Sequence, residues 1–395
     1  MNPELNQIIK NKSNQLFDKV RGYREHIHAN PELSFEETNT MNFVSQQLTK
    51  LGIEHTTGVG GTGVVATIMG NHHTDQDDFV GLRSDLDALP IQEENDLPYA
   101  SKVPGVMHAC GHDVHSSILL GAAEIIQDIR NEIPSPVKLI FQPGEEKNPG
   151  GASLMIKDGV LNNPEVSRMY AIHVYPELEA GKVGFREGLY MASCDEIYIT
   201  IKGKGGHGAM PHNCIDPIFI GSNIVTSLQE IVSRKCDPKI PCVLSFGHFE
   251  ALGATNVIPS KAILKGTFRT MNETWRNEAL ALIESTASGI ARSFGGEIEI
   301  EISRGYPFLE NDPMITAELK SKSTEFLGND NVIDLDIRMT AEDFSYYSQE
   351  VPVCFFRLGV RDEANGIIHG VHHPRFDIDS NALITGMQIM SLSVT

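Results

Sequence analysis

Residues 107–117, MHACGHDVHSS, bring together side chains that bind metal ions or react with electrophiles. A single glycine separates Cys110 from His112, so a tight turn would let a thiolate and an imidazole reach one centre. These two groups are the ligands that zinc and related divalent ions favour. The six cysteines of the chain are scattered and show no disulfide-like spacing, which leaves Cys110 free. The segment therefore predicts a metal ligand or a reactive thiol.

Further candidate ligands stand where apolar, strand-like segments end. They are Asp85, Asp87, Glu145, Glu146, His173 and the cluster HGVHHP at 369–374. Folds that alternate strands and helices place their sites at the carboxyl ends of the strands, so these residues are expected near Cys110. Each of them alone could belong to a solvated turn or a hydrogen-bonded core. Their joint occurrence favours a metal centre.

The elements that must position these residues alternate between strand and helix. The predicted strands are GTGVVATIMG, DFVGLRSDLDALPI, VKLIFQ, RMYAIHVYP and VCFFRLG, and the predicted helices cover 112–132, 313–327 and 380–393. Apolar residues at helical spacing also predict one amphipathic helix over the first 28 residues. This rhythm stops near residue 190 and resumes after about residue 306.

The intervening segment has a different order of elements. It reads as strand 195–202, helix 215–235, strands 242–250 and 260–270, helix 273–294 and strand 296–304. The order βαββαβ is typical of a ferredoxin-like sandwich. A chain of 395 residues also exceeds what one hydrophobic core usually supports. We therefore expect one domain interrupted by another.

Composition excludes several classes of partner. The formal net charge of −20 argues against nucleic acid and against an anionic membrane surface. The first residues lack the basic-then-apolar pattern of a signal peptide, and no run of 18 apolar residues predicts a membrane span. Scattered cysteines are typical of reduced thiols, so a cytoplasmic location is expected.

Eight motifs in order along the chain resemble those of the M20 metallopeptidases. They are RSDLDALPI, HACGHDVHSS, QPGEE, AIHV, GGHGAMPH, NVIP, AEDFS and VHHPRFD. They are most similar to the branch of aminoacylases, hippurate hydrolases and auxin-conjugate hydrolases, in which Cys-x-His replaces an aspartate-based motif. The resemblance extends from HANPELSFEE to the end of the chain.

This resemblance implies an α/β fold of two parts. A larger zinc-peptidase-like catalytic domain, residues 1–190 and 306–395, would be interrupted by a smaller ferredoxin-like α+β lid or dimerisation domain, residues 191–305. A homodimer through the lid domain is expected. The implied substrate is an N-acyl amino acid or a short peptide.

The resemblance also implies which residues hold metal. The implied ligands are Cys110, His112, Glu146, His173 and His372. His372 is preferred to His373 because the family's ligand stands two places before the proline, here Pro374. Five ligands are too many for one catalytic ion with an open position. They suit two divalent ions per subunit, Mn²⁺ or Zn²⁺.

The remaining roles follow from the same resemblance. Glu145 would be the general base, because its neighbour Glu146 binds metal. Asp87 would orient a ligand imidazole. His207 would stabilise the oxyanion, often from the partner subunit, and Asn256 and Arg269 would contact the substrate carboxylate. The residues whose roles stay open are Asp85, His108, His115, His369 and His373.

The predicted reaction is hydrolysis of an N-acetyl, N-benzoyl or similar N-acyl amino acid by a metal-activated water. A dipeptidase or aminopeptidase of the same family is one alternative. A cysteine amidase that uses Cys110 as nucleophile is a second, but it would leave Glu145 and the other candidate ligands without a role. A silent binding protein of the same fold is a third, and the presence of Glu145 argues against it.

Overall fold

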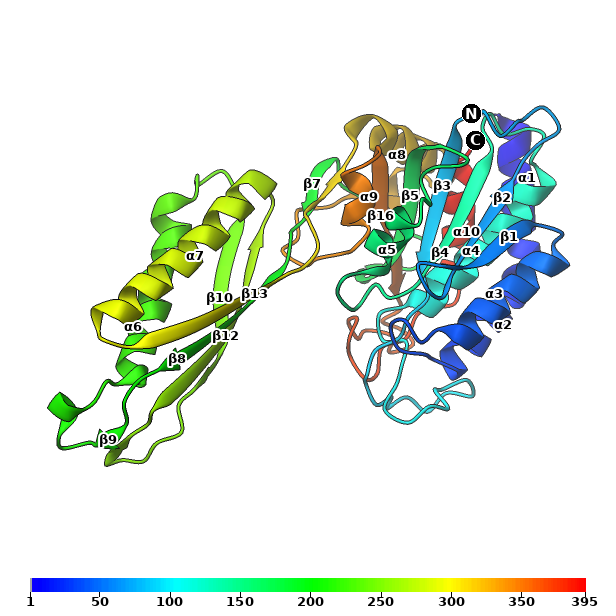
Figure 1. Ribbon diagram of the computed structural model, residues 1–395. Coiled ribbons are helices and arrows are strands. Elements are labelled where there is room, and N and C mark those ends of the chain that lie inside the picture. Colours follow the sequence, from blue (N-terminus) through cyan, green and yellow to red (C-terminus); the bar gives the residue numbers. More distant parts are fainter. Residues whose placement is uncertain (1) are drawn as a thin grey trace. The chain divides into compact units, whose positions relative to one another are not determined.

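The computed structural model describes residues 2–395, which form two compact units (Figure 1). Unit 1 contains the chain up to Gly188 together with Glu310–Asp336 and Asp343–Thr395, and unit 2 contains Leu189–Leu309 and Ile337–Glu342. The sequence did not assign 337–342 to the inserted part. The functional roles expected for 1–190 with 306–395 and for 191–305 stay predictions. No helix in the described chain is long and apolar enough to cross a membrane.

Unit 1 is built from helices around a sheet of eight strands. Its helices are α1 (Pro3–Gln15), α2 (Phe17–Ala29), α3 (Thr38–Lys50), α4 (His112–Asp128), α5 (Gly151–Lys157), α8 (Pro313–Leu327), α9 (Ser345–Ser348) and α10 (Ala382–Leu392). Its sheet strands are β1 (Glu54–Val59), β2 (Gly63–Ile68), β3 (Phe79–Asp85), β4 (Val137–Gln142), β5 (Val166–Glu179), β6 (Val183–Phe185), β15 (Val332–Asp334) and β16 (Val353–Arg361). A short 3₁₀ turn covers Asn329–Asn331.

The strands of the large sheet lie in the order β1-β2-β4-β3-β5-β16-β6-β15. β4, β3, β5 and β16 run parallel to one another, whereas β1 and β2 run antiparallel to their neighbours. β3 and β4 are buried along their whole length, which explains why they read as continuous apolar runs. The carboxyl ends of β4, β3 and β5 therefore meet at one edge of the sheet.

The N-terminal segment differs from the prediction of one long helix. It forms α1 and α2, which are separated at Leu16. Both helices contact α4 and α10, but α1 packs mainly against α10 and α2 mainly against α4, so the two halves take different directions. α4 also packs against α10 and β3, and its residues are buried over most of its length.

Unit 2 has the βαββαβ order that the sequence predicts. Its elements are β8 (Asp195–Lys202), β9 (Gly206–His207), a 3₁₀ turn (Pro211–Asn213), α6 (Pro217–Glu230), a π-helical turn (Ile231–Lys235), β10 (Cys242–Glu250), β11 (Val257–Ile258), β12 (Lys261–Thr270), α7 (Glu273–Ser293) and β13 (Glu297–Arg304). Two further strands, β7 (Gly188–Met191) and β14 (Leu309–Asn311), contain the residues at which the chain passes between the units.

The four long strands of unit 2 form an antiparallel sheet in the order β10-β12-β8-β13. α6 and α7 pack against each other and cover one face of this sheet (Figure 1). Residues of β8 alternate between buried and more exposed, as expected for a strand covered on one face. The fold class predicted from the sequence, an α/β domain with a smaller ferredoxin-like α+β insert, is confirmed.

A buried ion pair joins α7 of unit 2 to the β8 strand of its sheet. Arg276 of α7 donates from Nε and Nη2 to the two carboxylate oxygens of Asp195, at 2.8 and 2.7 Å. Both side chains are almost fully buried, and Nη2 also donates to the carbonyl of Gly305. A bidentate pair with its remaining donors satisfied stabilises the fold, but either partner alone would be a buried, uncompensated charge.

We expect Asp195→Ala to lower the free energy of unfolding of unit 2 by about 3–5 kcal/mol, because it leaves the Arg276 guanidinium without its main counter-charge. The single tryptophan, Trp275, lies in the core of this unit, so urea unfolding followed by its fluorescence measures the effect. Glu299→Ala is the matched control. It removes the exposed partner of Lys202 and is expected to cost about 0–1 kcal/mol. Equal losses in the two variants would contradict this assignment.

Candidate metal centre and active site

The register of the parallel strands places the predicted site residues at the same height along the strands, near their carboxyl ends. Asp85 pairs with Gln142 at the end of β4, and Arg83 pairs with Ala171 of β5, two residues before His173. Glu145 and Glu146 follow β4 after three and four residues. Their loop therefore begins beside the end of β3, which is where the sequence places Asp87.

The turn between Cys110 and His112 depends on Gly111. Its φ of 87° lies in the left-handed region, and an added Cβ would stand 2.6 Å from a methyl carbon of Val174. Only glycine meets both conditions without strain. The turn starts α4 directly at His112, so the thiol stands just before the helix and the imidazole in its first turn.

The loop that carries the paired glutamates is tightly folded. A Cβ on Gly151 would stand 1.6 Å from the carbonyl oxygen of Pro143, so a side chain there would force the loop open. The backbone N–H of Glu146 donates to Oδ2 of Asp87 at 3.0 Å. The N–H of Asp343 donates to Oε1 of Glu145 at 3.4 Å. Glu145 is buried, with 6% of its surface exposed.

The structure brings the five predicted ligands together in two groups. Cys110, His112 and His173 form one group, and Cys110, Glu146 and His372 form the other. Within each group the candidate ligand atoms all lie within 4.8 Å of one another. Nε2 of His173 lies 3.6 Å from the Cys110 sulfur, and Nε2 of His372 lies 3.2 Å from Oε1 of Glu146. Cys110 is common to both groups.

Glu145 also belongs to this cluster. One of its carboxylate oxygens lies within 4.8 Å of the candidate ligand atoms of His112 and Glu146. Asp87 stands behind the cluster, where Nδ1 of His112 donates to Oδ1 at 3.1 Å and the hydroxyl of Ser34 donates to Oδ2 at 2.6 Å. This contact holds the proton of His112 on Nδ1 and turns Nε2 towards the cluster.

The charges around the cluster favour a bound cation. Burial lowers the pKa of His112, but the negative charges of Asp85 and Asp87 outweigh it and raise the pKa to about 10. Burial, with the charges of Glu146 and Glu145, raises the pKa of the Cys110 thiol well above its usual value. The same charges that hold protons on these groups would stabilise a divalent cation in their place.

Nε2 of His112 is one of several buried side-chain atoms that have no hydrogen-bond partner in residues 2–395, and it faces the other ligand atoms of the cluster. Oε1 of Glu146 has no regular hydrogen bond either, and only the Nε2 atom of His372 approaches it, at 3.2 Å. Buried polar atoms are rarely left without a partner, so an unpartnered nitrogen among other ligand atoms is a place for a metal ion. A soft thiolate, neutral imidazoles and a carboxylate form a donor set that suits Zn²⁺ or Mn²⁺. The residues present therefore fit a divalent metal centre.

His372 reaches the cluster from a loop with an unusual backbone. Its φ of 64° is uncommon for a residue with a Cβ, and its N–H donates to the carbonyl of Ala109 at 2.7 Å. Half of its side chain is exposed, whereas Cys110, His112 and His173 are buried. Strain of this kind gathers at functional sites, where neighbouring contacts hold it.

The three predicted residues of unit 2 lie in two separate places. His207 of β9 pairs with Val257 of β11, and the carbonyl of Asn256 accepts a hydrogen bond from the N–H of Gly208 at 2.8 Å. His207 and Asn256 are thus neighbours, and both are exposed. Arg269 lies near the other end of β12, where it donates to the carbonyl of Met339 at 3.0 Å.

The residues whose roles were open fall into three kinds. Asp85 and His115 are buried and hydrogen-bonded to each other. His108 is buried and its ring has no hydrogen-bond partner within the described chain. His369 and His373 stack on each other, with ring centres 4.2 Å apart. Sequence reasoning missed Ser34 and Asp343, although both stand in motifs that it quoted, HANPELSFEE and AEDFS.

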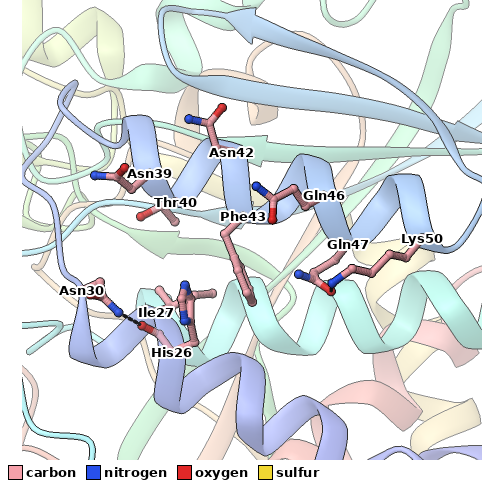
Figure 2. Close-up of a pocket in the computed structure, with 10 residues that line it drawn as sticks. All are labelled: His26, Ile27, Asn30, Asn39, Thr40, Asn42, Phe43, Gln46, Gln47 and Lys50. Atoms are coloured by element: carbon pink, nitrogen blue, oxygen red, sulfur yellow. Dashed lines mark hydrogen bonds between the residues drawn. The ribbon is translucent and has the colours of Figure 1, made fainter.

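A separate groove of about 570 Å³ lies between α2 and α3. Figure 2 shows Phe43 beside His26, with the side-chain amide of Asn30 donating to the carbonyl of His26. Amide side chains such as Gln46 also line it, together with Thr40 and Lys50. None of the predicted site residues lines this groove.

Comparison with known proteins agrees with the motifs. The sequence model of peptidase family M20/M25/M40 matches residues 81–394. An N-acyl-L-amino acid amidohydrolase of Geobacillus stearothermophilus is 43% identical over 303 residues, 76% of this chain and 80% of that protein. Thermostable carboxypeptidase 2 of Saccharolobus solfataricus is 38% identical over 390 residues, 97% of this chain and 96% of that protein.

A solved structure extends the likeness to three dimensions. The Bacillus subtilis YXEP protein, described as a dinuclear metal binding peptidase from the M20 family, superposes with a TM-score of 0.81 at 33% identity, covering 96% of this chain and 98% of that one. Sequence and structure thus agree over nearly the whole chain. The chain belongs to peptidase family M20/M25/M40 and is a hydrolase that acts on amide or peptide bonds.

Proposed function

We propose that this hydrolase cleaves the amide bond of N-acyl amino acids, such as N-acetyl or N-benzoyl amino acids, with two divalent ions per subunit and Glu145 as general base. One observation carries the proposal. The two groups of candidate ligands share Cys110, and Glu145 stands beside them. Cys110, His112, Glu146, His173 and His372 would together hold two ions, whereas five ligands are too many for a single catalytic ion with an open position.

Support for this centre comes from the donor atoms and from a relative. Nε2 of His112 has no hydrogen-bond partner in residues 2–395, and a metal ion would satisfy it. The YXEP protein is described as dinuclear. We propose Mn²⁺ or Zn²⁺ as the ions, because imidazole, thiolate and carboxylate ligands accept both.

The chain's own residues would carry the proton transfers. When bound, the ions supply a polarised carbonyl oxygen and a water whose pKa falls to about 7. Glu145 takes a proton from the attacking water on a carboxylate oxygen and passes it to the departing amine nitrogen. The C–N bond breaks, and a carboxylic acid and a free amino acid leave. Asp87 holds the His112 ring and the backbone of Glu146 in place meanwhile.

The positions in unit 2 support a site built from two subunits. Eight residues of β12 separate Lys261, beside β9 and β11, from Arg269, which corresponds to about 26 Å of strand. His207 with Asn256 and Arg269 of one chain are therefore too far apart to contact one N-acyl amino acid. We propose a homodimer in which His207 and Asn256 serve the oxyanion and carboxylate of a substrate held by the partner subunit, while Arg269 binds a carboxylate as a bidentate donor.

Two alternatives share part of this chemistry. A dipeptidase, aminopeptidase or carboxypeptidase would use the same centre, and the Saccharolobus relative carries the name carboxypeptidase. A Cys110 nucleophile is disfavoured, because the thiolate is the reactive form and burial beside two glutamates raises the pKa of this thiol. All six cysteines are free thiols, which supports the proposed cytoplasmic location.

The first test is a substrate panel on protein loaded with Mn²⁺ or Zn²⁺. We expect N-acetyl and N-benzoyl amino acids to be hydrolysed faster than dipeptides, and a chelator to abolish the activity until the metal is restored. Product release measured by amine detection reports both. Chelator-resistant turnover, with an acyl group trapped on Cys110 in intact-mass spectra, would instead establish the cysteine amidase. Faster cleavage of dipeptides would move the assignment to a peptidase.

The second test separates the two glutamates. Glu145→Gln is expected to keep both ions and to lose about 10²–10⁴-fold in kcat, because the amide cannot accept the proton of water. Glu146→Gln is the matched control and is expected to lose bound metal. Elemental analysis beside steady-state kinetics distinguishes them. Loss of metal in Glu145→Gln would show that Glu145 is a ligand and that the base lies elsewhere.

The third test asks whether the site uses two subunits. His207→Ala and Glu145→Gln are each expected to be nearly inactive, but mixing them in equal amounts should restore about one quarter of wild-type activity, since half of the dimers become hybrids with one complete site. Subunit exchange is followed with two affinity tags. Exchange without recovered activity would place His207 in the site of its own subunit or outside catalysis.

A further inference from the structure

Both ring nitrogens of His115 are occupied. Nδ1 lies 2.6 Å from Oδ1 of Asp85, and Nε2 lies 2.9 Å from the backbone N–H of Val174. The Asp85 carboxylate accepts hydrogen bonds, so Nδ1 of His115 carries the proton and donates it. Nε2 is then the acceptor for the Val174 N–H. The ring is fully buried and is held in one tautomer.

This arrangement argues against a metal ion held by Asp85, His112 and His115. Candidate ligand atoms of Asp85, His112 and His115 lie within 4.8 Å of one another, as in the two groups described above. The lone pair of His115, however, is directed at an N–H and is not available to an ion. The Asp85 carboxylate is also engaged, since Nη1 of Arg83 donates to Oδ2 at 2.7 Å.

The backbone carbonyl of Val174 also fixes the tautomer of a proposed ligand, His173. The carbonyl oxygen lies 2.8 Å from Nδ1 of His173, which must donate because a carbonyl only accepts. Nε2 of His173 therefore keeps its lone pair, and that atom lies 3.6 Å from the sulfur of Cys110. The tautomer that this contact imposes is the one that a ligand imidazole needs.

The strand pairing explains why the backbone N–H of Val174 needs a side-chain acceptor. The ladder between β3 and β5 ends at the pair Arg83 and Ala171, two residues before β3 itself ends at Asp85. The N–H of Val174 lies beyond that last pair, in a buried region where an unpaired N–H is costly. The His115 ring satisfies this N–H and fixes the backbone that carries His173.

We propose that Asp85 and His115 are positioning residues, which act through the backbone of Val174 to hold His173 with its Nε2 lone pair directed at the metal centre. This inference rests on the proposed function, since it takes His173 as a ligand. It gives a role to two residues of the motifs RSDLDALPI and HACGHDVHSS that are not ligands themselves. Neighbours that orient a ligand in this way typically contribute about 10- to 100-fold to metal affinity.

The test uses two amide substitutions of different length. In His115→Gln the side-chain oxygen reaches the place of Nε2 and can accept from Val174, whereas in His115→Asn the shorter amide keeps only the Asp85 contact. We expect His115→Asn to bind Co²⁺ about 10- to 100-fold more weakly than the wild type, and His115→Gln to recover most of the affinity. Competition with a chelating dye measures the dissociation constants.

Absorption spectra of the Co²⁺-loaded proteins supply the second readout. The thiolate-to-cobalt band from Cys110 should persist in His115→Asn at saturating Co²⁺, while the ligand-field bands should shift, because only the imidazole of His173 has changed its orientation. A structural defect alone would not separate the two signals. If circular dichroism shows that His115→Asn does not fold, Asp85→Asn is the second variant. It removes the charged acceptor of the His115 Nδ1 proton and is expected to weaken Co²⁺ binding to a similar extent.

His108→Asn is the control, since His108 is a buried histidine of the same motif whose ring contacts no hydrogen-bond partner in the described chain. We expect it to bind Co²⁺ as the wild type does. Equal affinity and spectra for His115→Asn and the wild type would overturn the inference, and so would an equal loss in His108→Asn. A wild-type protein that shows no thiolate-to-cobalt band would overturn the proposed metal centre instead.

Discussion

An excess of buried negative charge at one edge of the large sheet is the constraint on which this structure depends. Asp85, Asp87 and Glu145 are buried there, and Cys110 becomes a further anion when it binds metal. The buried guanidinium of Arg83 is shared between Asp85 and Asp343, at 2.7 and 2.8 Å. Charges removed from water require a counter-charge. A pair of divalent ions would supply this counter-charge. The ions that the proposed reaction needs would therefore also offset the buried negative charge of the fold.

The fold brings these buried groups together with a rigid set of parallel strands and with loops whose backbone has unusual conformations. The parallel register of β3, β4 and β5 sets the levels of the polar residues, and strands buried along their length hold that register firmly. The special backbone conformations lie where the ligands must turn inward, at Gly111 and at His372. Ligands drawn from segments as distant as 110 and 372 meet only when the whole of unit 1 is folded. Metal binding is therefore expected to be coupled to the stability of this unit.

Much of the architecture could be read from patterns in the sequence. The strands and helices of unit 2 were predicted in order, because each is long enough to show a period, as β8 does with its alternating burial. β9 and β11 were missed because strands of two residues have no detectable period. The break at Leu16 was missed because both helices present apolar residues at the same spacing, although α1 packs mainly on α10 and α2 mainly on α4. Asp343 stands in a quoted motif, but only the fold brings its N–H to Glu145.

The sequence by itself determined the family, the order of the elements and the residue types available for metal binding, because motifs and periodicity are local properties of the chain. The family resemblance implied His112 as a ligand and left the role of His115 open, but no local feature gives a physical reason for the difference, since the two stand one helical turn apart on α4. Tertiary structure separated them through their partners. Nε2 of His115 accepts from the N–H of Val174, whereas Nε2 of His112 has no hydrogen-bond partner in residues 2–395. An imidazole whose lone pair is already used cannot hold a metal ion, and only packing decides which lone pair is used.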